Sequence, residues 1–177
     1  NTIDLATGET TELGSILAGL PSRRVYYETN SLPSWSWSPD GTRIVLGARG
    51  GSLYTVDVRS GERSLLVRLP GEEPPSVEDE ALSSVDEVLW SPDGAHIAFQ
   101  WGGPYRSDPQ IYVVNSNGTN LQQVTSNTGV KSYAVWSPDG RKIAYSRAFD
   151  WSLSIFLVGL DGSDQGRLTA DSSWNDV

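Results

Sequence analysis

Short apolar runs with polar neighbours recur along this chain, and one type of run occurs three times. Residues 43–46, 96–99 and 142–145 read Arg-Ile-Val-Leu, His-Ile-Ala-Phe and Lys-Ile-Ala-Tyr. In all three runs the register places the isoleucine on one face and a polar residue beside it. Alternation of this kind over a few residues is typical of β-strands. The pattern therefore predicts three equivalent strands.

Each of these strands is followed by a second apolar run and then by a turn that contains glycine. The glycines are Gly61, Gly118 and Gly162, and glycine is common in turns of this kind. A short fourth strand follows the turn. The predicted third strands are 53–58, 111–115 and 155–158, and the predicted fourth strands include 121–125 and 167–169.

The five residues Trp-Ser-Pro-Asp-Gly precede each strand that has the isoleucine register. The copies begin at residues 37, 90 and 136, so they are 53 and 46 residues apart. Proline fixes φ at about −65° at the first central position of a type I turn, Asp tolerates the next position, and Gly takes the left-handed conformation that follows. We therefore expect a tight hairpin in each repeat, with the Trp ending the incoming strand and packing between repeats. The residues with this structural role are Trp37, Pro39, Asp40, Gly41, Trp90, Pro92, Asp93, Gly94, Trp136, Pro138, Asp139 and Gly140.

A four-stranded repeat of this length predicts a β-propeller, in which each blade is an antiparallel sheet. The expected fold class is all-β, with about three complete blades and partial blades at both ends. Residues 3–9 match residues 56–62, so the chain is expected to open in the middle of a third strand. The predicted division is 1–20 for the end of a blade, 34–70, 85–126 and 131–170 for three blades, and 171–177 for the start of the next blade.

The Trp-Ser-Pro-Asp-Gly turns, the Ile-Ala-Phe/Tyr strands and the Ile-Tyr-Val-Val strand at 111–114 resemble the WD40-like repeats of the TolB-type β-propeller family. The resemblance covers nearly the whole chain, although residues 21–33 and 71–87 depart from the compact connections of that family. It implies a ring of about six to eight blades. It also implies a periplasmic or extracellular location, and a role as a protein-binding platform or as an accessory domain beside a catalytic one.

Charge and residue composition restrict the function classes. The formal net charge is −9, with 22 acidic against 13 basic residues, which argues against nucleic-acid binding because clustered Lys and Arg are needed to neutralise phosphates. Cysteine is absent, so disulfides, thiol catalysis and thiolate metal sites are excluded. No apolar run approaches the length of a membrane span, so we expect no membrane insertion.

The sequence contains no recognisable catalytic motif. The one histidine, His96, aligns with Arg43 and Lys142, which indicates a position for a solvated polar side chain. A Ser-His-Asp triad would need this histidine, and no Gly-x-Ser-x-Gly elbow occurs. A phosphate loop, a dinucleotide fingerprint and a His-x-x-x-His zinc pair are also absent. We therefore expect a chain that is not an enzyme and that has no cofactor and no metal site.

An acidic segment with two consecutive prolines lies at residues 71–87, and three interpretations of it remain open. Such a run is typical of a solvated loop. The alternatives are a docking surface for a basic partner and a loose calcium site built from oxygen ligands. The acidic residues are Glu72, Glu73, Glu78, Asp79, Glu80, Asp86 and Glu87.

The irregular segments of the repeats are predicted to gather at one end of the blades. In a four-stranded antiparallel blade, the second-to-third loops and the blade-to-blade connections emerge at the end opposite the Pro-Asp-Gly turns. We call these two ends the loop end and the turn end. The predicted second-to-third loops are 101–109 and 147–152.

Aromatic and Arg side chains, which are enriched in binding hot spots, occur in these loop-end segments. Direct contact with a partner is one interpretation of them. The other is that the aromatics brace long loops against the blades. The candidate binding residues are Tyr26, Tyr27, Trp101, Tyr105, Arg106, Phe149, Asp150 and Trp151.

Two functional classes follow from these observations. The first is a non-catalytic propeller that presents the loop end to a protein or peptide. The second is an accessory propeller domain of a prolyl-oligopeptidase-like serine peptidase, and a carbohydrate-binding propeller is a third option because exposed aromatics also stack on sugars. Incomplete blades at both ends would leave strand edges exposed, so we also expect a homodimer that completes a ring or pairs its edge strands.

Overall fold

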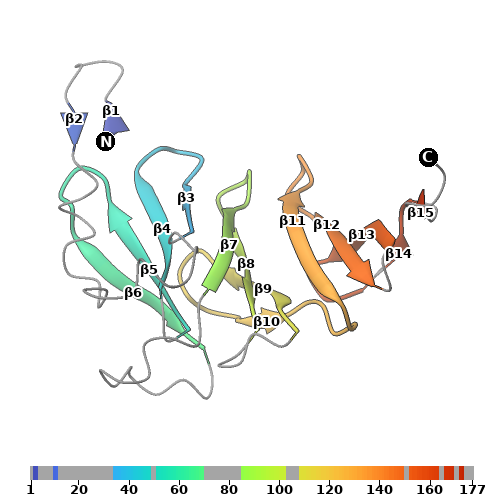
Figure 1. Cartoon of the computed structure of the whole chain (residues 1–177). Helices are drawn as coiled ribbons and strands as arrows, with labels where there is room; N and C mark the ends of the chain where they lie inside the picture. Colours follow the sequence, from blue (N-terminus) through green and yellow to red (C-terminus); the bar gives the residue numbers. More distant parts are fainter. Residues whose placement is uncertain are drawn as a thin grey trace.

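The computed structural model describes residues 2–3, 10–11, 34–48, 51–69, 85–102, 108–149, 152–163, 166–169 and 172–173. Every regular element within these ranges is a β-strand. The strands form three antiparallel sheets that stand side by side along an arc, and one two-stranded pair (Figure 1). The predicted all-β architecture of four-stranded blades is therefore confirmed.

In each blade, strands that are consecutive in sequence are hydrogen-bonded neighbours, as expected for a propeller blade. The first blade contains β3 (Trp35–Trp37), β4 (Arg43–Ala48), β5 (Ser52–Asp57) and β6 (Arg63–Arg68). The second contains β7 (Val85–Trp90), β8 (His96–Trp101), β9 (Gln110–Asn115) and β10 (Gln122–Gln123). The third contains β11 (Val130–Trp136), β12 (Lys142–Phe149), β13 (Ser152–Gly159) and β14 (Gly166–Arg167).

Short strands lie near both ends of the chain. β1 (Thr2–Ile3) and β2 (Thr10–Thr11) pair antiparallel, and the pair Ile3↔Thr10 has the same seven-residue separation as Val56↔Arg63 in the first blade. At the other end β15 (Ser172–Ser173) pairs with β13 of the third blade. Neither pairing tests the predicted division of the chain, which stays a prediction.

The strand boundaries agree with the sequence-based ones to within a few residues, with one larger difference. β12 and β13 pair continuously from Lys142↔Gly159 to Phe149↔Ser152. Residues 147–149 and 152 were expected in a loop, but they belong to strands, so only residues 150 and 151 separate β12 from β13. Pairs such as Ala148↔Leu153 extend the β12–β13 ladder beyond the strand ends that the local sequence pattern predicted.

The Pro-Asp-Gly turns have the predicted geometry. In the first copy the Gly41 amide donates to the Ser38 carbonyl oxygen at 2.9 Å, which closes a four-residue turn. Gly41, Gly94 and Gly140 have φ values of 69°, 75° and 69°. These values lie in the left-handed region that glycine adopts without steric cost.

Most of the buried apolar side chains of the described residues lie in the joints between successive blades, and a smaller cluster of Ile44, Leu46 and Val56 lies on the first blade. In the first joint, Val45 and Leu53 of the first blade pack against Ile97 and Phe99 of the second, together with the indole of Trp90. This is the packing expected of a repeat in which each unit buries its apolar face against a neighbour.

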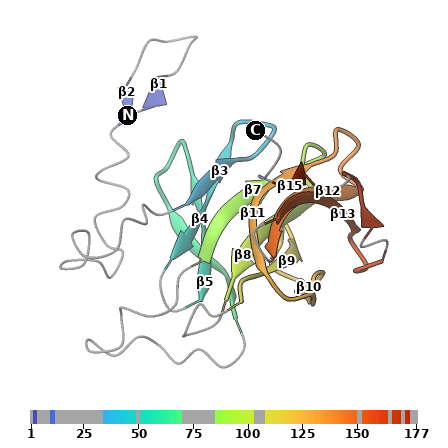
Figure 2. The same ribbon diagram turned by 45° about the vertical axis from the view of Figure 1, so that its right-hand side comes forward.

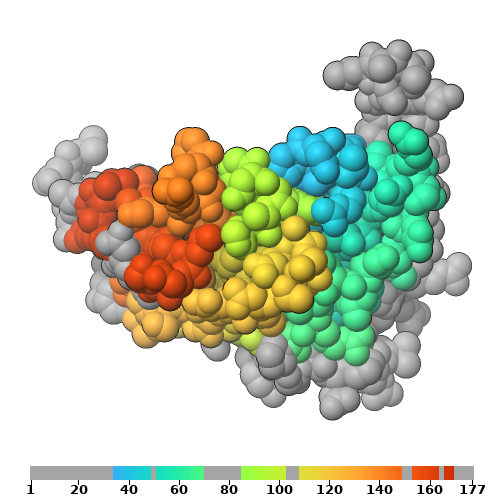
Figure 3. Space-filling model, turned by 180° about the vertical axis from the view of Figure 1, so that it is seen from behind, coloured from blue at the N-terminus to red at the C-terminus, as the bar shows by residue number. Residues whose placement is uncertain are grey.

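The second joint uses equivalent positions, one blade further along the arc. Ala98 and Ile111 of the second blade pack against Ile143 and Tyr145 of the third. Each blade therefore has a preceding face, on the side of Ile44, Ile97 or Ile143, and a following face, on the side of Leu53, Ile111 or Ile155. Figures 2 and 3 show the second blade between the first and third blades, which lie at opposite ends of the arc.

The motif tryptophans are not equivalent in burial. Trp90 is only 6% exposed and Trp136 is half-buried, whereas Trp37 is 42% exposed. The prediction that each motif Trp packs between repeats therefore holds for Trp90 and Trp136. Trp37 lies on the preceding face of the first blade, next to residues that lie outside the described ranges, so the prediction is not tested there.

Candidate functional site

The aspartates of the turn end are engaged in their own turns. Asp40 Oδ1 accepts hydrogen bonds from Ser38 Oγ at 2.6 Å and from the Thr42 amide at 3.0 Å. The Ser38 hydroxyl is the largest cause, and the Thr42 bonds the next, of a lowering of the Asp40 pKa to about 2. The carboxylate is thus kept ionised by the turn that it stabilises.

The same arrangement recurs in the other two copies of the motif. Asp93 accepts from Ser91 Oγ at 2.5 Å and Asp139 accepts from Ser137 Oγ at 2.6 Å. In both cases this serine bond is the largest cause of a lowered aspartate pKa. These carboxylates stabilise their own turns. Among the described residues, no group of three or more His, Asp or Glu side chains is arranged to hold a metal ion.

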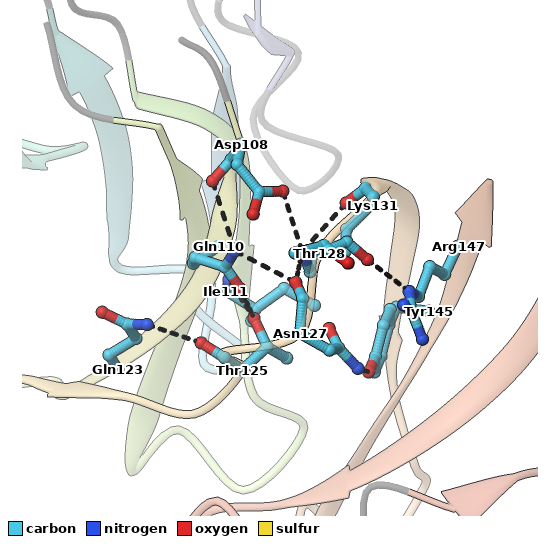
Figure 4. Close-up of polar contacts among 11 residues, drawn as sticks. Asp108, Gln110, Ile111, Gln123, Thr125, Asn127, Thr128, Lys131, Tyr145 and Arg147 are labelled. Atoms are coloured by element: carbon cyan, nitrogen blue, oxygen red, sulfur yellow. Dashed lines mark hydrogen bonds and ion pairs between the residues drawn. The ribbon is translucent and has the colours of Figure 1, made fainter. Parts of the chain in front are cut away.

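The loop end of the second joint contains a different kind of site, which is centred on Lys131. Its side chain is fully buried, and Nζ donates to the carbonyl oxygens of Asn127 and Gly129, the latter at 2.9 Å (Figure 4). Nζ also lies 3.3 Å from Asp108 Oδ1. Burial lowers the pKa of Lys131, and Asp108 opposes this shift by favouring the ammonium form. We call this group of residues the Lys131 anchor.

Two further polar side chains connect the Lys131 anchor to the second blade. Gln110 Nε2 donates to the carbonyl oxygens of Asp108 and Asn127, at 3.3 and 3.2 Å. Gln110 Oε1 accepts from Thr125 Oγ1 at 2.8 Å, and Thr125 Oγ1 in turn accepts from the Ile111 amide at 2.9 Å. Hydrogen bonds from Gln110, the first residue of β9, therefore join Asp108, before β9, to Asn127, in the connection before β11 (Figure 4).

The third blade completes the network. Arg147 Nε donates to the Thr128 carbonyl oxygen at 2.5 Å, and Asn127 Nδ2 donates to the Tyr145 hydroxyl at 3.1 Å. Because the connection between the blades is bound from both sides, the loop end at this joint has a fixed base.

Trp101 lies at the end of β8, where it pairs with Gln110 in β9. Its indole is half-buried, packs against the core of the first joint and meets Tyr112 edge to face at 5.5 Å. Its buried Nε1 has no hydrogen-bond partner in the part of the chain that the structure describes. This packing matches the bracing interpretation of Trp101, while its contact with a partner stays a prediction.

Phe149 is the last residue of β12, and residues 150 and 151 separate it in sequence from β13. Its neighbour Ala148 pairs with Val130 on one side and Leu153 on the other. Val130, Ala148 and Leu153 are all exposed, so they form an apolar row across the loop end of the third blade. We call this the loop-end row.

The other candidate binding residues lie outside the described residues, so the structure does not place them. They are Tyr26, Tyr27, Tyr105, Arg106, Asp150 and Trp151. The acidic segment also lies outside, except for its last three residues, and the three interpretations of it stay open.

Glu87, within that acidic segment, has a specific structural partner. It has a φ of 48°, at a register shift between Asp86 and Leu89 in the β7–β8 pairing. Its carboxylate accepts hydrogen bonds from the amides of Tyr133 and Ala134 in β11, at 2.8 and 3.1 Å. Glu87 is therefore not part of a solvated loop but joins the second blade to the third.

His96 also differs from its predicted environment. It is half-buried, its ring centroid lies 6.4 Å from that of Trp136, and its buried Nδ1 lacks a partner within the described residues. The expectation of a solvated side chain is wrong because strand β8 turns this position toward the next blade. Arg43 at the equivalent position lies over Trp90 in the same way.

Lys131 and Glu87 are the residues that the sequence-based reasoning missed. Glu87 does have a signal, because it stands three residues before the motif Trp, at the position of Ser34 in the first blade. The Ser34 hydroxyl likewise accepts from the Val88 amide of the next blade at 2.7 Å. Lys131 has no comparable signal, since two of its partners are carbonyl oxygens that any sequence provides and the third, Asp108, lies 23 residues earlier.

The chain is similar to several known proteins over part of their lengths. It is 29% identical over 157 residues to an uncharacterized protein of Agrobacterium fabrum, and the match covers 86% of this chain and 48% of that protein. It is 29% identical over 130 residues to the protein TolB homolog of Chlorobium luteolum, covering 73% of this chain and 27% of that protein. It is also 28% identical over 83 residues to dipeptidyl-peptidase 5 of Porphyromonas endodontalis, covering 45% and 12%. The chain thus spans about half or less of the relatives that it matches, and no protein-family model matches it.

Solved structures agree with these similarities at the level of the fold. TolB from Acinetobacter baumannii superposes with a TM-score of 0.58 at 21% identity, covering 79% of this chain and 32% of that one. A putative TolB from Agrobacterium tumefaciens gives 0.55 at 24% identity, covering 82% and 53%. The resemblance to TolB-like β-propeller repeats is thereby confirmed. In the described ranges no helix is long and apolar enough to cross a membrane.

Proposed function

We propose that the chain is a non-catalytic β-propeller that acts as an interaction platform for a protein or peptide, with the loop end as its binding face. The observation that carries this proposal is the Lys131 anchor, which fixes the base of the loop end between the second and third blades. A fixed scaffold under variable loops is the usual design of binding sites, because ordering a loop beforehand reduces the entropy lost on binding.

The loop between β8 and β9 supports this proposal because the anchor reaches one of its ends. Asp108 lies just after residues 103–107, and its carboxylate and carbonyl oxygens are bound by Lys131 and Gln110. Tyr105 and Arg106 belong to that loop. Tyr and Arg are enriched in binding hot spots, so a short loop that carries both on a fixed base is suited to contact with a partner.

The third blade offers a second contact area at the same end. The loop-end row of Val130, Ala148 and Leu153 is exposed, and Asp150 and Trp151 follow Ala148 and Phe149 in the sequence. An apolar patch beside an aromatic residue and a carboxylate suits a peptide with an apolar and a basic side chain. The chain's net charge of −9 is compatible with a basic partner.

The proposal extends to location and assembly. We place the protein in the periplasm or outside the cell, on the basis of its similarity to TolB proteins alone. We also propose that two copies associate as a homodimer. The proposal includes neither a nucleic-acid partner nor insertion into a membrane.

The binding face can be tested with matched variants. Tyr105→Ala/Arg106→Ala changes the loop held by the Lys131 anchor, and Arg59→Ala/Arg141→Ala changes exposed turn-end residues. Wild type and both variants are incubated with a peptide array that includes basic and apolar sequences, and the bound protein is measured. We expect wild type and the turn-end variant to retain the same peptides and the loop variant to lose them. Loss of binding in the turn-end variant alone would contradict the proposal.

A second candidate function is an accessory propeller domain of a serine peptidase. The observation that favours it is the similarity over 83 residues to dipeptidyl-peptidase 5. The two functions differ in what accompanies the propeller, because a peptidase needs a nucleophilic Ser with Asp and His in a separate domain. Sequencing the complete reading frame decides between them: a nucleophile elbow followed by Asp and His selects the peptidase.

A further inference from the structure

The turn between β9 and β10 carries the one Asn-Gly pair in the sequence, Asn117-Gly118. An asparagine before glycine is especially reactive, because its side-chain carbonyl carbon lies within reach of the next backbone nitrogen and glycine has no Cβ to shield that nitrogen. Attack closes a succinimide ring and releases ammonia. The pair lies at the turn end, opposite the proposed binding face, since the Ser116 amide donates to the Ala95 carbonyl oxygen of the β7–β8 turn at 2.8 Å.

Thr119 holds the side-chain carbonyl group of Asn117 in place. Asn117 Oδ1 accepts from the Thr119 amide at 3.1 Å and from Thr119 Oγ1 at 2.6 Å. Asn115 Nδ2 donates to Thr119 Oγ1 at 2.9 Å, which directs the hydroxyl hydrogen toward Asn117. Two donors on this oxygen stabilise the negative charge that it gains when Cγ is attacked, as in an oxyanion hole. The Asn117 side chain is exposed, so the departing ammonia enters solvent directly.

The attacking nitrogen is engaged while the turn is closed. The Gly118 amide donates to the Asn115 carbonyl oxygen at 2.8 Å. An ideal Cβ on Gly118 would lie 2.3 Å from the Leu66 carbonyl oxygen, so the turn is packed against β6 of the first blade. Ring closure therefore requires a brief opening of the turn, and its rate follows the population of the open form. The bonds from Thr119 to Asn117 span only two residues, so they persist when the Asn115 oxygen releases the amide.

The third blade has an equivalent turn that already contains an aspartate. The Gly162 amide donates to the Gly159 carbonyl oxygen at 3.0 Å, and Asp161 stands at the position of Asn117. The Ser163 amide donates to Asp161 Oδ1 at 2.9 Å. The side-chain hydrogen bond from Ser163 is the largest cause of a lowered Asp161 pKa. An ionised aspartate therefore fits this turn, with a hydroxyl residue two positions later.

We propose that Asn117 is a modification site at which the folded turn assists the conversion of asparagine to aspartate, with the Thr119 donors stabilising the charge on Oδ1. The Gly118 nitrogen loses its proton to a base in solvent and bonds to Asn117 Cγ, while the bond from Cγ to Nδ2 breaks and that nitrogen leaves, protonated, as ammonia. Water then opens the succinimide at either carbonyl carbon and gives aspartate or isoaspartate. The net change replaces an amide by a carboxylate and adds one negative charge. This inference goes beyond the proposed function and does not depend on it.

Variants at position 119 test the proposal because they change the hydroxyl donor and keep the backbone donor. Thr119→Val removes Oγ1 but preserves the shape of the side chain, and Thr119→Ser keeps the hydroxyl in the form that the third blade has. Asn117→Gln is the unreactive control, since its longer side chain would have to close a larger ring. Each protein is incubated at mildly alkaline pH for several weeks. The tryptic peptide 107–131 is then analysed by mass spectrometry for aspartate and isoaspartate at position 117.

We expect conversion in wild type and in Thr119→Ser, conversion at least about tenfold slower in Thr119→Val, and none in Asn117→Gln. In concentrated urea, wild type and Thr119→Val should convert at equal rates because the folded turn is absent. Hydrogen exchange of the Gly118 amide is measured in each folded variant, which separates a change in turn opening from a loss of charge stabilisation.

Several results would overturn the proposal. A wild type that keeps Asn117 throughout the incubation would show that the site does not react. A Thr119→Val variant that converts as fast as wild type, after correction for Gly118 exchange, would show that the hydroxyl gives no assistance. Equal slowing of this variant in urea would assign the effect to local sequence rather than to the fold. Asn117→Asp should have the same urea midpoint as wild type, and a clearly lower one would show that the aspartate product does not fit the turn as Asp161 does.

Discussion

The guanidinium carbon of Arg43 lies 5.0 Å from the centre of the Trp90 ring, across the joint between the first and second blades. His96 and Trp136 repeat this relationship across the next joint, with ring centroids 6.4 Å apart. In both joints the first residue of a second strand covers the motif Trp of the following blade. The Arg43 contact is favourable because the face of an indole ring carries negative charge density that attracts a cation. The motif Trp is therefore both a turn residue and the anchor of a joint.

Replacing the motif tryptophans should show this dependence on position. Trp90→Ala should lower the free energy of unfolding by about 3–5 kcal/mol, because it leaves a cavity in the core of the first joint. Trp37→Ala should cost about half of that or less, since a large part of its ring is already in solvent. Urea denaturation of both variants, at a concentration where association is suppressed, provides the comparison. Equal losses would show that Trp37 is covered in solution.

Removing the Glu87 carboxylate should weaken the second joint. Glu87→Ala takes away the acceptor of the Tyr133 and Ala134 amides, and we expect a loss of about 1.5–3 kcal/mol, the range for hydrogen bonds to a charged group. Glu62→Ala, in an exposed turn, is the matched control and should change stability by less than about 0.5 kcal/mol. Equilibrium denaturation of both variants measures the difference. A Glu87 variant as stable as the control would contradict the role of this bridge.

The Lys131 anchor should be sensitive to loss of its ammonium group. Lys131→Met keeps most of the side-chain volume but leaves two carbonyl oxygens and Asp108 without their donor, so we expect a loss of about 2–3 kcal/mol. Hydrogen exchange should also become faster in residues 125–131, since the connection between the blades loses its central contact. Arg141→Met at the turn end should change neither quantity. Unchanged exchange in the Lys131 variant would show that the connection is held by its other contacts.

Acid should destabilise the fold through the turn aspartates. The Asp40 pKa is lowered from 3.8 to about 2 in the folded chain, and the pKa values of Asp93 and Asp139 are lowered as well. A lowered folded pKa gives stability that is fully present above the unfolded value of about 4 and is lost as the pH falls through about 2. Urea midpoints measured between those limits should therefore decrease as the pH is lowered. Asp40→Asn and Ser38→Ala should each flatten part of this decrease, and an unchanged pH dependence in both would contradict the assignment.

Much of the blade could be predicted from the sequence because its determinants are local. The Pro39-Asp40-Gly41 turn depends on conformational preferences of adjacent residues, and the observed φ of Gly41 agrees with them. The strands that follow were predicted because their apolar periodicity is read over a few positions. The extension of β12 to Phe149 was missed because pairing with β13, rather than the local pattern, sets its end.

The candidate site was harder to predict because its contacts join residues that are distant in sequence. Glu87 bonds to amides 46 and 47 residues later, and these bonds require both the left-handed backbone at Glu87 and the placement of β11. His96 aligned with Arg43 and Lys142, but the alignment did not show that this position faces the next blade. Trp101 was assigned to a loop, whereas the structure places it at the end of β8 against the first joint.

The sequence by itself determined the unit of this protein: four strands, a Pro-Asp-Gly turn and an apolar register, each specified by neighbouring residues. Tertiary structure decided how those units use their side chains. Three tryptophans in identical pentapeptides have different environments, because burial depends on what packs against the preceding face of each blade. The blade is thus encoded locally, whereas its joints and the Lys131 anchor arise only when successive blades are placed side by side.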